Sequence, residues 1–214
     1  MKLSKRISKI LEFIDVNDKV ADIGCDHGYL GLGCIEKGVS FLQNIDNKKG
    51  PLDTAKRNLK DYEHENVIYT LCDGLDGLHE NIDTVVISGM GGDLISQIIK
   101  KNLSKALKLK KIILVAHTKV QFLRSEIMDN FKIIDETLVE DNKKIYEIMI
   151  LNPSPDNNYS YEDIMFGPIL RTKKEDLFIK KLNKRLDELN NILAITSENE
   201  ALIKERIKIM EILK

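Results

Sequence analysis

The sequence lacks an excess of charge of either sign: its 214 residues carry 33 Lys and Arg against 34 Asp and Glu, a formal net charge of −1. There is thus no global basic signal for nucleic acid, and any nucleic-acid binding has to come from local patches. Long apolar runs are missing too. No stretch approaches the ~20 residues of a transmembrane helix, and residues 1–14 lack the apolar run and cleavage site of a signal peptide. We therefore expect a cytoplasmic protein that does not associate with membranes.

Cysteine is scarce as well. The three residues, Cys25, Cys34 and Cys72, are odd in number and do not have the spacing of metal ligands. This usage fits reduced thiols in the cytosol and argues against a disulfide framework. The sequence therefore predicts neither disulfide bonds nor a metal site.

Strand-like and helix-like patterns alternate through residue 151. The alternation predicts a parallel, doubly wound α/β sheet, and the last two apolar runs form a hairpin around Asp141–Asn142 that must add one antiparallel strand. Seven strands with a reversed edge strand resemble the Rossmann-like fold of class I S-adenosylmethionine (SAM) methyltransferases, whereas dinucleotide dehydrogenases lack the closing hairpin. The predicted strands are 19–23, 40–45, 67–71, 84–88, 111–116, 131–141 and 143–151.

Capping residues set the expected helix boundaries. Ser4 is the predicted N-cap of a helix over residues 3–14, and Gly38 ends the helix that begins at Leu30. Pro51 suits the first position of the next helix. Two more helices are expected, one entered through the glycines at 89–92 and one over residues 119–129.

Residues 159–214 have a different pattern, and the linker-like stretch NPSPDNN (152–158) separates them from the domain over residues 1–158. Two helices are expected, one over residues 170–195 and one that starts at a capping box of Ser197 and Glu200. Their apolar seams predict an antiparallel coiled-coil hairpin. The seam residues are Leu182, Leu186, Leu189 and Leu193, then Leu202, Ile209 and Leu213, with Ile203, Ile207 and Met210 widening the second stripe.

The stretch KVADIGCDHGYL (19–30) predicts a strand, a glycine turn and a helix start, a unit that binds nucleotide-like ligands. A dinucleotide fingerprint needs Gly-x-Gly-x-x-Gly, but the corresponding residues here are Gly24, Asp26 and Tyr29. A carboxylate at Asp26 repels a diphosphate, whereas it suits a sulfonium or ammonium group. The turn therefore favours SAM over NAD, and a purely structural turn is the alternative. The candidate residues around the methionine end of SAM are Asp22, Gly24, Asp26 and Gly28.

Acidic residues also follow the second and third strands. Asp46, with Asn47 beside it, stands where a carboxylate takes the ribose hydroxyls of a nucleoside ligand. Asp73 is a candidate acceptor for the adenine amino group, with Gly74 and Leu75 lining the ring. Alone, Asp73 would be read as an ordinary turn residue, but the series of acids along one sheet edge favours ligand contact.

The turn after the fourth strand contains Gly89, Met90, Gly91 and Gly92, where methyltransferases place the groups that face the transferred methyl. The Asn/Asp-Pro-Pro-aromatic motif of adenine-amino methylases is absent from this turn. Because three of the four residues are glycines, we expect backbone N–H and C=O groups to be accessible to a ligand at this turn. Close packing of a helix on the strand is the alternative reading.

Several residues are candidates for contact with a substrate. His27 and Tyr29 lie just inside the glycine turn, and Tyr29 is suited to stacking on a base. His117 follows the fifth strand, where it would donate to a base or phosphate. Lys5 and Arg6 lie on the basic face of the first helix. The alternatives are a capping role for His27, packing for His117 and a solvated helix face for Lys5 and Arg6.

These motifs together resemble the bacterial tRNA (adenine-N1)-methyltransferase family that modifies position 22 of tRNA. The resemblance implies SAM as methyl donor, tRNA as substrate and a coiled-coil C-terminal extension. It places Asp22, Gly24 and Gly28 at the methionine end, Asp46 at the ribose, Asp73 at the adenine and Gly89 to Gly92 at the methyl site. The similar pieces are LSKRI near residue 3, ADIGCDHGYL (21–30), GPLDTAKRNL (50–59), DGL (73–75), ISGMGGDLI (87–95), YEIMI (146–150) and FGPIL (166–170).

Two positions depart from that family. Asp46 stands where relatives have glutamate, which is a mild chemical change. Ala116–His117–Thr118 stands where relatives read Gln-Pro-Asn, so a role for this turn does not carry over from the family.

Methylation at adenine N1 needs no deprotonation, because N1 attacks with an in-plane lone pair. We therefore expect catalysis by positioning, with no essential general base, and with His27, Tyr29 and Met90 at the reacting end. A monomer is expected. The alternatives are a SAM-dependent methyltransferase of a small molecule or protein and a non-catalytic SAM- or nucleotide-binding module. A NAD oxidoreductase is disfavoured by Asp26 and Tyr29.

Overall fold

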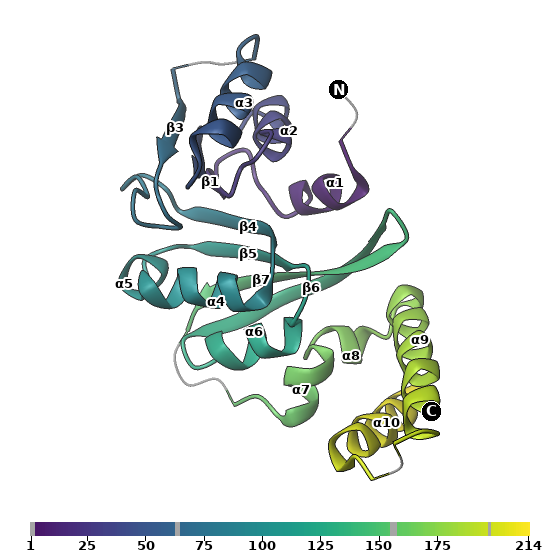
Figure 1. The fold of residues 1–214 in the computed structure, drawn as a ribbon. Helices are drawn as coiled ribbons and strands as arrows, with labels where there is room; N and C mark the ends of the chain where they lie inside the picture. The colour runs from purple at the N-terminus through teal and green to yellow at the C-terminus, as the bar shows by residue number, and fades with distance from the viewer. Residues whose placement is uncertain (1–2, 63–64, 155–157, 197) are drawn as a thin grey trace. The chain divides into compact units, whose positions relative to one another are not determined.

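A seven-stranded sheet forms the centre of the unit over Met1–Asn158 in the computed structural model (Figure 1), which describes residues 3–62, 65–154, 158–196 and 198–214. The strand order is β3-β2-β1-β4-β5-β7-β6. The first five strands in this order are parallel, and β7 runs antiparallel to both β5 and β6. The predicted fold class is therefore confirmed. The strands are β1 (Lys19–Ile23), β2 (Phe41–Asp46), β3 (Val67–Leu71), β4 (Thr84–Met90), β5 (Lys111–Ala116), β6 (Phe131–Asp141) and β7 (Lys144–Pro153).

Helices cover both faces of this sheet. Figure 1 shows α1, α2 and α3 on one side and α4, α5 and α6 on the other. Coverage of both faces explains why the central strands are almost continuously apolar and buried rather than alternating. The helices are α1 (Lys5–Leu11), α2 (Tyr29–Lys37), α3 (Lys49–Leu59), α4 (Gly92–Lys101), α5 (Leu103–Ala106) and α6 (Val120–Ile127).

The core beneath α1 and α2 ties the amino-terminal helix to the sheet. Ile10 and Ile14 are fully buried there, against strand residues that include Val86 and Ile113. Each such side chain stabilises the fold by roughly 1.5–3 kcal/mol through burial. This packing sets where α1 lies at the edge of the sheet, which matters for the site below.

Two of the predicted capping residues are confirmed, although the helix expected over residues 3–14 extends only over Lys5–Leu11. Ser4 caps α1 by accepting from the Ile7 N–H, and Gly38 ends α2 with φ +83°. The placement of Pro51 was wrong: α3 begins two residues earlier, at Lys49, and Pro51 is its third residue. The first turn of a helix has no internal partners for its N–H groups, so proline is tolerated there too.

A buried ionic cluster joins α6 to the closing hairpin. Arg124 is fully buried and donates from Nη2 to Glu136 at 2.8 Å and also to Glu147. Both carboxylates are themselves buried. Taking three charges out of water is costly, so the cluster is stable only while all three groups remain together.

We expect Arg124→Ala to lower the free energy of unfolding by about 3–5 kcal/mol, because it leaves two buried carboxylates without their shared cation. Urea unfolding followed by circular dichroism measures this. The matched control is Lys100→Ala, which removes the exposed Lys100–Glu126 pair and should cost less than about 1 kcal/mol. Equal effects of the two substitutions would contradict this reading of the cluster.

The unit over Tyr159–Lys214 is entirely helical in its described part. It contains α7 (Tyr161–Phe166), α8 (Leu170–Lys173), α9 (Asp176–Leu193) and α10 (Glu200–Leu213). The last two helices pack against each other, and Arg185 of α9 forms a bidentate ion pair with Glu205 of α10, at 2.8 and 2.9 Å. Leu182, Leu189 and Ile209 of the predicted seams are buried.

Three details of this unit differ from the prediction. The helix expected over 170–195 is broken at Lys174, which adopts a left-handed conformation with φ +48°. Ile207 and Met210 are 47% and 40% exposed, so they do not widen the buried stripe. Ser197 of the expected capping box lies outside the described residues, and Asn199 caps α10 by accepting from the Leu202 N–H.

Within the described ranges, no helix combines the length and the apolar character needed to cross a bilayer.

Candidate functional site

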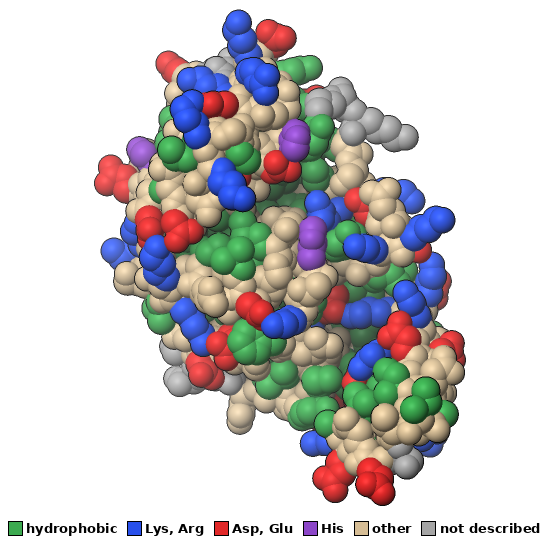
Figure 2. Space-filling view, viewed as in Figure 1, with side chains coloured by type: hydrophobic (Ala, Val, Ile, Leu, Met, Phe, Trp, Pro, Cys, Tyr) green, Lys and Arg blue, Asp and Glu red, His purple; other side chains and the backbone are tan. Residues whose placement is uncertain are grey.

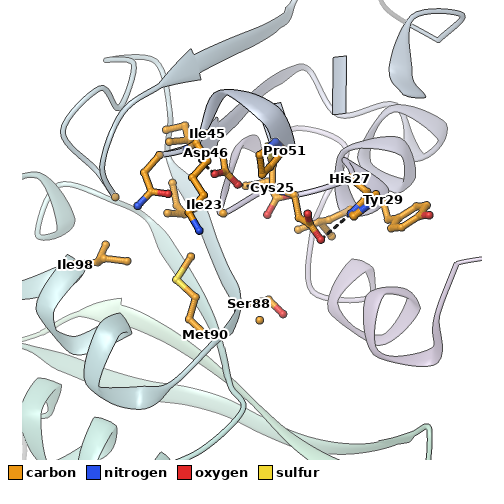
Figure 3. A pocket seen from close by; sticks show the side chains of 18 of the residues that line it. Ile23, Cys25, His27, Tyr29, Ile45, Asp46, Pro51, Ser88, Met90 and Ile98 are labelled. Atoms are coloured by element: carbon orange, nitrogen blue, oxygen red, sulfur yellow. Dashed lines mark hydrogen bonds and ion pairs between the residues drawn. The ribbon is translucent and has the colours of Figure 1, made fainter. Parts of the chain in front are cut away.

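A cavity of about 460 Å³ opens at the carboxyl ends of β1 to β4, where the strand order reverses between β1 and β4. This reversal point is where open α/β sheets bind ligands, and the volume is in the range of small-molecule sites. Figure 3 shows the side chains that converge on it. The polar lining residues are Arg6, Asp22, Asp26, His27, Tyr29, Asp46, Asn47, Lys48, Asp73 and Ser88.

The glycine loop after β1 is anchored to β2. The N–H groups of Gly24 and Cys25 both donate to the Ile45 carbonyl, at 2.8 and 3.0 Å. Gly24 has φ +75°, and a Cβ added there would collide with the Met90 methyl group. Asp26 also has a positive φ of 47°, which is uncommon for a residue with a side chain. The loop therefore needs glycine at 24 and holds Asp26 in a strained conformation beside the cavity.

Asp22 lies at the base of the cavity and is only 5% exposed. Burial, together with the negative charges of Asp46 and Asp26, raises the pKa of Asp22 to about 7. Three carboxylates thus create a negative potential at one end of the cavity. Such a site suits a ligand with a positively charged group, which would relieve the repulsion among the acids.

Asp46 is held in place by backbone donors. Its Oδ1 accepts from the Lys48 N–H at 2.9 Å, and its Oδ2 accepts from the Asp26 N–H at 3.3 Å. A carboxylate offers about four acceptor positions, so each oxygen keeps a lone pair for a ligand. The two bonds fix the direction of those lone pairs, which is the preorganisation that a pair of ribose hydroxyls requires.

A β-bulge points Met90 into the cavity. Ser88 pairs with Val115 and Met90 with Ala116, so Gly89 is an extra residue in β4. Gly89 has φ +90°, a conformation that glycine adopts without strain. Figure 3 shows the Met90 side chain reaching toward the glycine loop. The bulge therefore places a soft, uncharged thioether in the cavity wall beside Gly24.

Asp73 and Gly74, which follow β3, also line the cavity. Gly74 packs so closely on Ile98 of α4 that an added Cβ would lie 2.8 Å from that side chain. Leu75, expected beside a ligand ring, is instead buried in the core, with 1% exposure. The wall here consists of Gly74 and Ile98.

His27 and Tyr29 lie at the mouth of the cavity. Their rings stack at a centroid distance of 5.8 Å and an angle of 8°. His27 Nδ1 is 2.7 Å from an Asp26 oxygen, the dashed contact in Figure 3. Tyr29 is 38% exposed, so this aromatic pair presents a surface to solvent.

Arg6 and His117, which are 111 positions apart in sequence, meet at the rim. Arg6 donates to His117 Nε2 at 2.5 Å, and its guanidinium lies over the Tyr146 ring, 5.0 Å from the centroid. Burial and the charges of Arg6 and Lys144 lower the pKa of His117. The neutral ring accepts at Nε2, so Nδ1 carries the remaining proton and is a donor. Tyr146 was not among the predicted site residues, because its position depends on the register in which β7 pairs with β6.

Six predicted residues, all within the described ranges, are not part of the cavity lining. Leu75 is in the core, and Gly92 packs against the backbone of Lys119, where an added Cβ would lie 2.4 Å from the carbonyl oxygen. Gly28 caps α2 and packs against Ala55, and Gly91 caps α4 near Thr118. Lys5 lies on the exposed surface of α1. His117 contacts the lining residues without lining the cavity itself: its ring accepts from Arg6, and its backbone N–H donates to the Met90 carbonyl at 2.8 Å.

Apolar lining residues were the main omission. These residue types are the same as those of the hydrophobic core. Only their position at the ends of strands and helices distinguishes them as cavity-lining residues. They are Ile7, Ile10, Ile23, Cys25, Leu30, Ile45, Pro51, Cys72, Leu94 and Ile98. In the described part of the chain, no three His, Cys, Asp or Glu side chains are grouped to hold a metal ion.

The geometry agrees with the comparisons to known proteins. The sequence matches the family described as tRNA (adenine(22)-N(1))-methyltransferase over residues 20–213. The Bacillus subtilis (strain 168) protein of that name is 29% identical over 230 residues, which cover 100% of this chain and 96% of the relative.

Solved structures give the same result. Streptococcus pneumoniae Sp1610 in complex with S-adenosyl-L-methionine has a TM-score of 0.92 and 28% identity, with 100% of both chains covered. M. capricolum TrmK in complex with S-adenosyl-homocysteine has a TM-score of 0.84 and 25% identity, with 99% of this chain and 96% of that chain covered. The match over most of its length shows that this chain belongs to the tRNA (adenine(22)-N(1))-methyltransferase family.

Proposed function

We propose that this chain transfers the methyl group of SAM to N1 of adenine 22 in tRNA, the reaction for which its family is named. The observation that carries the proposal is the series of acids along one cavity: Asp22, Asp46 and Asp73 lie at or within two residues of the carboxyl ends of three neighbouring parallel strands. An adenosine with a cationic tail needs carboxylates in this order.

The residues present fit SAM. Gly24 makes the tight turn after β1 with φ +75°, and the negative potential around Asp22 suits an ammonium and a sulfonium. Asp46 would accept from both ribose hydroxyls. Asp73 would accept from the adenine amino group, between Gly74 and Ile98.

SAM supplies a methyl group on a positively charged sulfur. The adenine N1 lone pair attacks without prior loss of a proton, so this chain has no proton to remove at that step. Its residues bind, orient and exclude water, and in-line alignment supplies most of the rate. Met90 and the Gly89 bulge would frame the methyl group, and His27 with Tyr29 would hold the target base after it leaves the tRNA stack.

Arg6, His117 and Tyr146 form the proposed contact with tRNA beside the target base. Arg6 offers a fixed guanidinium, and His117 offers its Nδ1 proton. Figure 2 shows Lys and Arg side chains at several places around a partly hydrophobic hollow on this face, with acidic side chains among them. Because contacts between such local cations and phosphates release counterions, the binding of tRNA should be sensitive to salt.

Methylation of bulk tRNA tests the proposal. Protein is incubated with SAM carrying a labelled methyl group and with tRNA from cells that lack this modification, and the tRNA is digested to nucleosides. We expect the label in 1-methyladenosine. Label in a protein or small-molecule fraction, or in another nucleoside, would contradict the assignment.

A truncation separates the two units. We expect residues 1–158 to keep the affinity of the full chain for S-adenosylhomocysteine within about twofold, since every described lining residue lies in that unit. We expect tRNA methylation to fall at least about 100-fold, on the proposal that the helical unit contacts the tRNA body. Calorimetry and the nucleoside assay measure the two properties, and full tRNA activity in the truncated protein would exclude a role for the helical unit.

A further inference from the structure

One face of α4 forms part of the cavity wall. Leu94 and Ile98 line the cavity, and Figure 3 shows Ile98 pointing into it. Lys101 follows Ile98 by three residues, and the spacing of four and then three keeps all three side chains on one face of the helix. Lys101 therefore extends this face beyond the apolar wall, toward the loop after β3.

Lys101 binds that loop directly. Its Nζ lies 2.9 Å from Asp73 Oδ2 and 2.9 Å from Asp76 Oδ2. Hydrogen bonds to Asp76 and Asp73 raise the pKa of Lys101, so the ammonium stays charged in any ordinary assay. Asp73 is thus tied to the end of α4.

Neighbouring residues fasten the same loop. Asn102 donates to Asp76 Oδ1 at 3.0 Å, and Lys105 donates to the carbonyls of Leu75 and Asp76. Gly74 sits against Ile98 in the same segment. Residues at the junction of α4 and α5 therefore bind the loop at several points, and the bond to Asp73 comes from Lys101.

We infer that Lys101 is a positioning residue that holds Asp73 to accept from the adenine amino group of SAM, and so helps the site to distinguish adenine from hypoxanthine. This inference rests on the proposed function. Asp73 has an exposed side chain, which would otherwise rotate freely at an entropic cost to ligand binding. Lys101 engages Oδ2, and the carboxylate keeps acceptor positions for an amino group. The 6-oxo group of hypoxanthine is an acceptor and cannot replace that donor.

Calorimetry with S-adenosylhomocysteine and its hypoxanthine counterpart tests the inference on the full-length protein. We expect Lys101→Met to weaken binding of the adenine ligand about tenfold, because a charge-assisted contact loses its fixed geometry. Binding of the hypoxanthine ligand should change less than about twofold. Lys101→Arg should restore most of the preference for adenine.

A double-mutant cycle separates positioning from a general structural effect. In an Asp73→Asn background, Lys101→Met should change the affinity less than about twofold, since the residue that it positions is already altered. Lys100→Met is the matched control on the same helix, because Lys100 pairs with Glu126 rather than with the loop, and should leave both ligands unaffected. Equal weakening of both ligands by Lys101→Met, or no weakening, would overturn the inference. Wild-type protein that binds neither ligand would overturn the SAM site itself, a separate failure.

Discussion

Asp22→Asn should give a protein that is more stable than the wild type and that no longer binds SAM. Asp22 is buried beside Asp46 and Asp26, and its pKa is raised to about 7. Its ionisation in the folded protein is therefore unfavourable, at a cost on the order of 2–4 kcal/mol. The neutral amide has nearly the same shape without that cost, but it cannot offer a carboxylate to the ammonium group of SAM.

The pKa of Asp22 is higher in the folded protein than in the unfolded chain, and this sets how the free energy of unfolding depends on pH. The ordinary pKa of the group is 3.8, so the unfolded chain releases the proton at a lower pH than the folded protein does. The destabilisation by Asp22 therefore grows from about pH 4 to about pH 7 and is constant above that. We expect wild type and Asp22→Asn to unfold with equal free energy near pH 4, and the variant to be more stable by about 2 kcal/mol or more at pH 8.

Urea unfolding at pH 4.5 and pH 8, together with calorimetric titration of S-adenosylhomocysteine, measures both effects. Wild-type affinity should fall as the pH drops below about 7, because Asp22 becomes protonated. Asp22→Ala is the packing control, since it removes the charge but also leaves a cavity. If Asp22→Asn destabilises the protein at pH 8 and still binds the ligand, the electrostatic account of the cavity is wrong.

Asp46→Ala should reduce the affinity for SAM by about 100-fold or more, since it removes the acceptor for two ribose hydroxyls. It also frees the Asp26 and Lys48 N–H groups that Asp46 now holds. The fold should persist, because the lost carboxylate also relieves the repulsion on Asp22. Calorimetry measures the affinity, and circular dichroism checks the fold.

Asp46→Glu is the matched control, because it keeps the charge and lengthens the side chain by one methylene. We expect it to retain affinity within about tenfold, as part of the ribose contact survives. Normal binding by Asp46→Ala would remove Asp46 from the ribose site. Equal loss in both variants would indicate a collapsed loop rather than a lost acceptor.

Much of the architecture follows from local patterns in the sequence. The alternation of apolar runs with helical periodicity predicts the sheet, and acids at the ends of three parallel strands are brought to one edge by topology alone. Asp22, Asp46 and Asp73 line one cavity for that reason. Glycine at 24 marks the turn because its φ is positive.

Other features depend on register and packing, which local sequence does not encode. The bulge that aims Met90 appears only when β4 pairs with β5. Arg6 meets His117 because the core beneath α1 sets the position of that helix on the sheet. Lys101 looks like an ordinary exposed lysine until α4 is packed beside the β3 loop. The break at Lys174 has no glycine or proline to signal it.

Mapping the methylated position in tRNA decides whether this chain modifies N1 of adenine 22. Two unmodified transcripts of one tRNA, identical except for adenine or guanine at position 22, are incubated with the full-length protein and labelled SAM, and the products are mapped by mass spectrometry of nuclease fragments. We predict one methyl group per molecule, at N1 of adenine 22, and no label in the guanine transcript. Equal labelling of both transcripts, or a methyl group on the exocyclic nitrogen of adenine, would contradict the account.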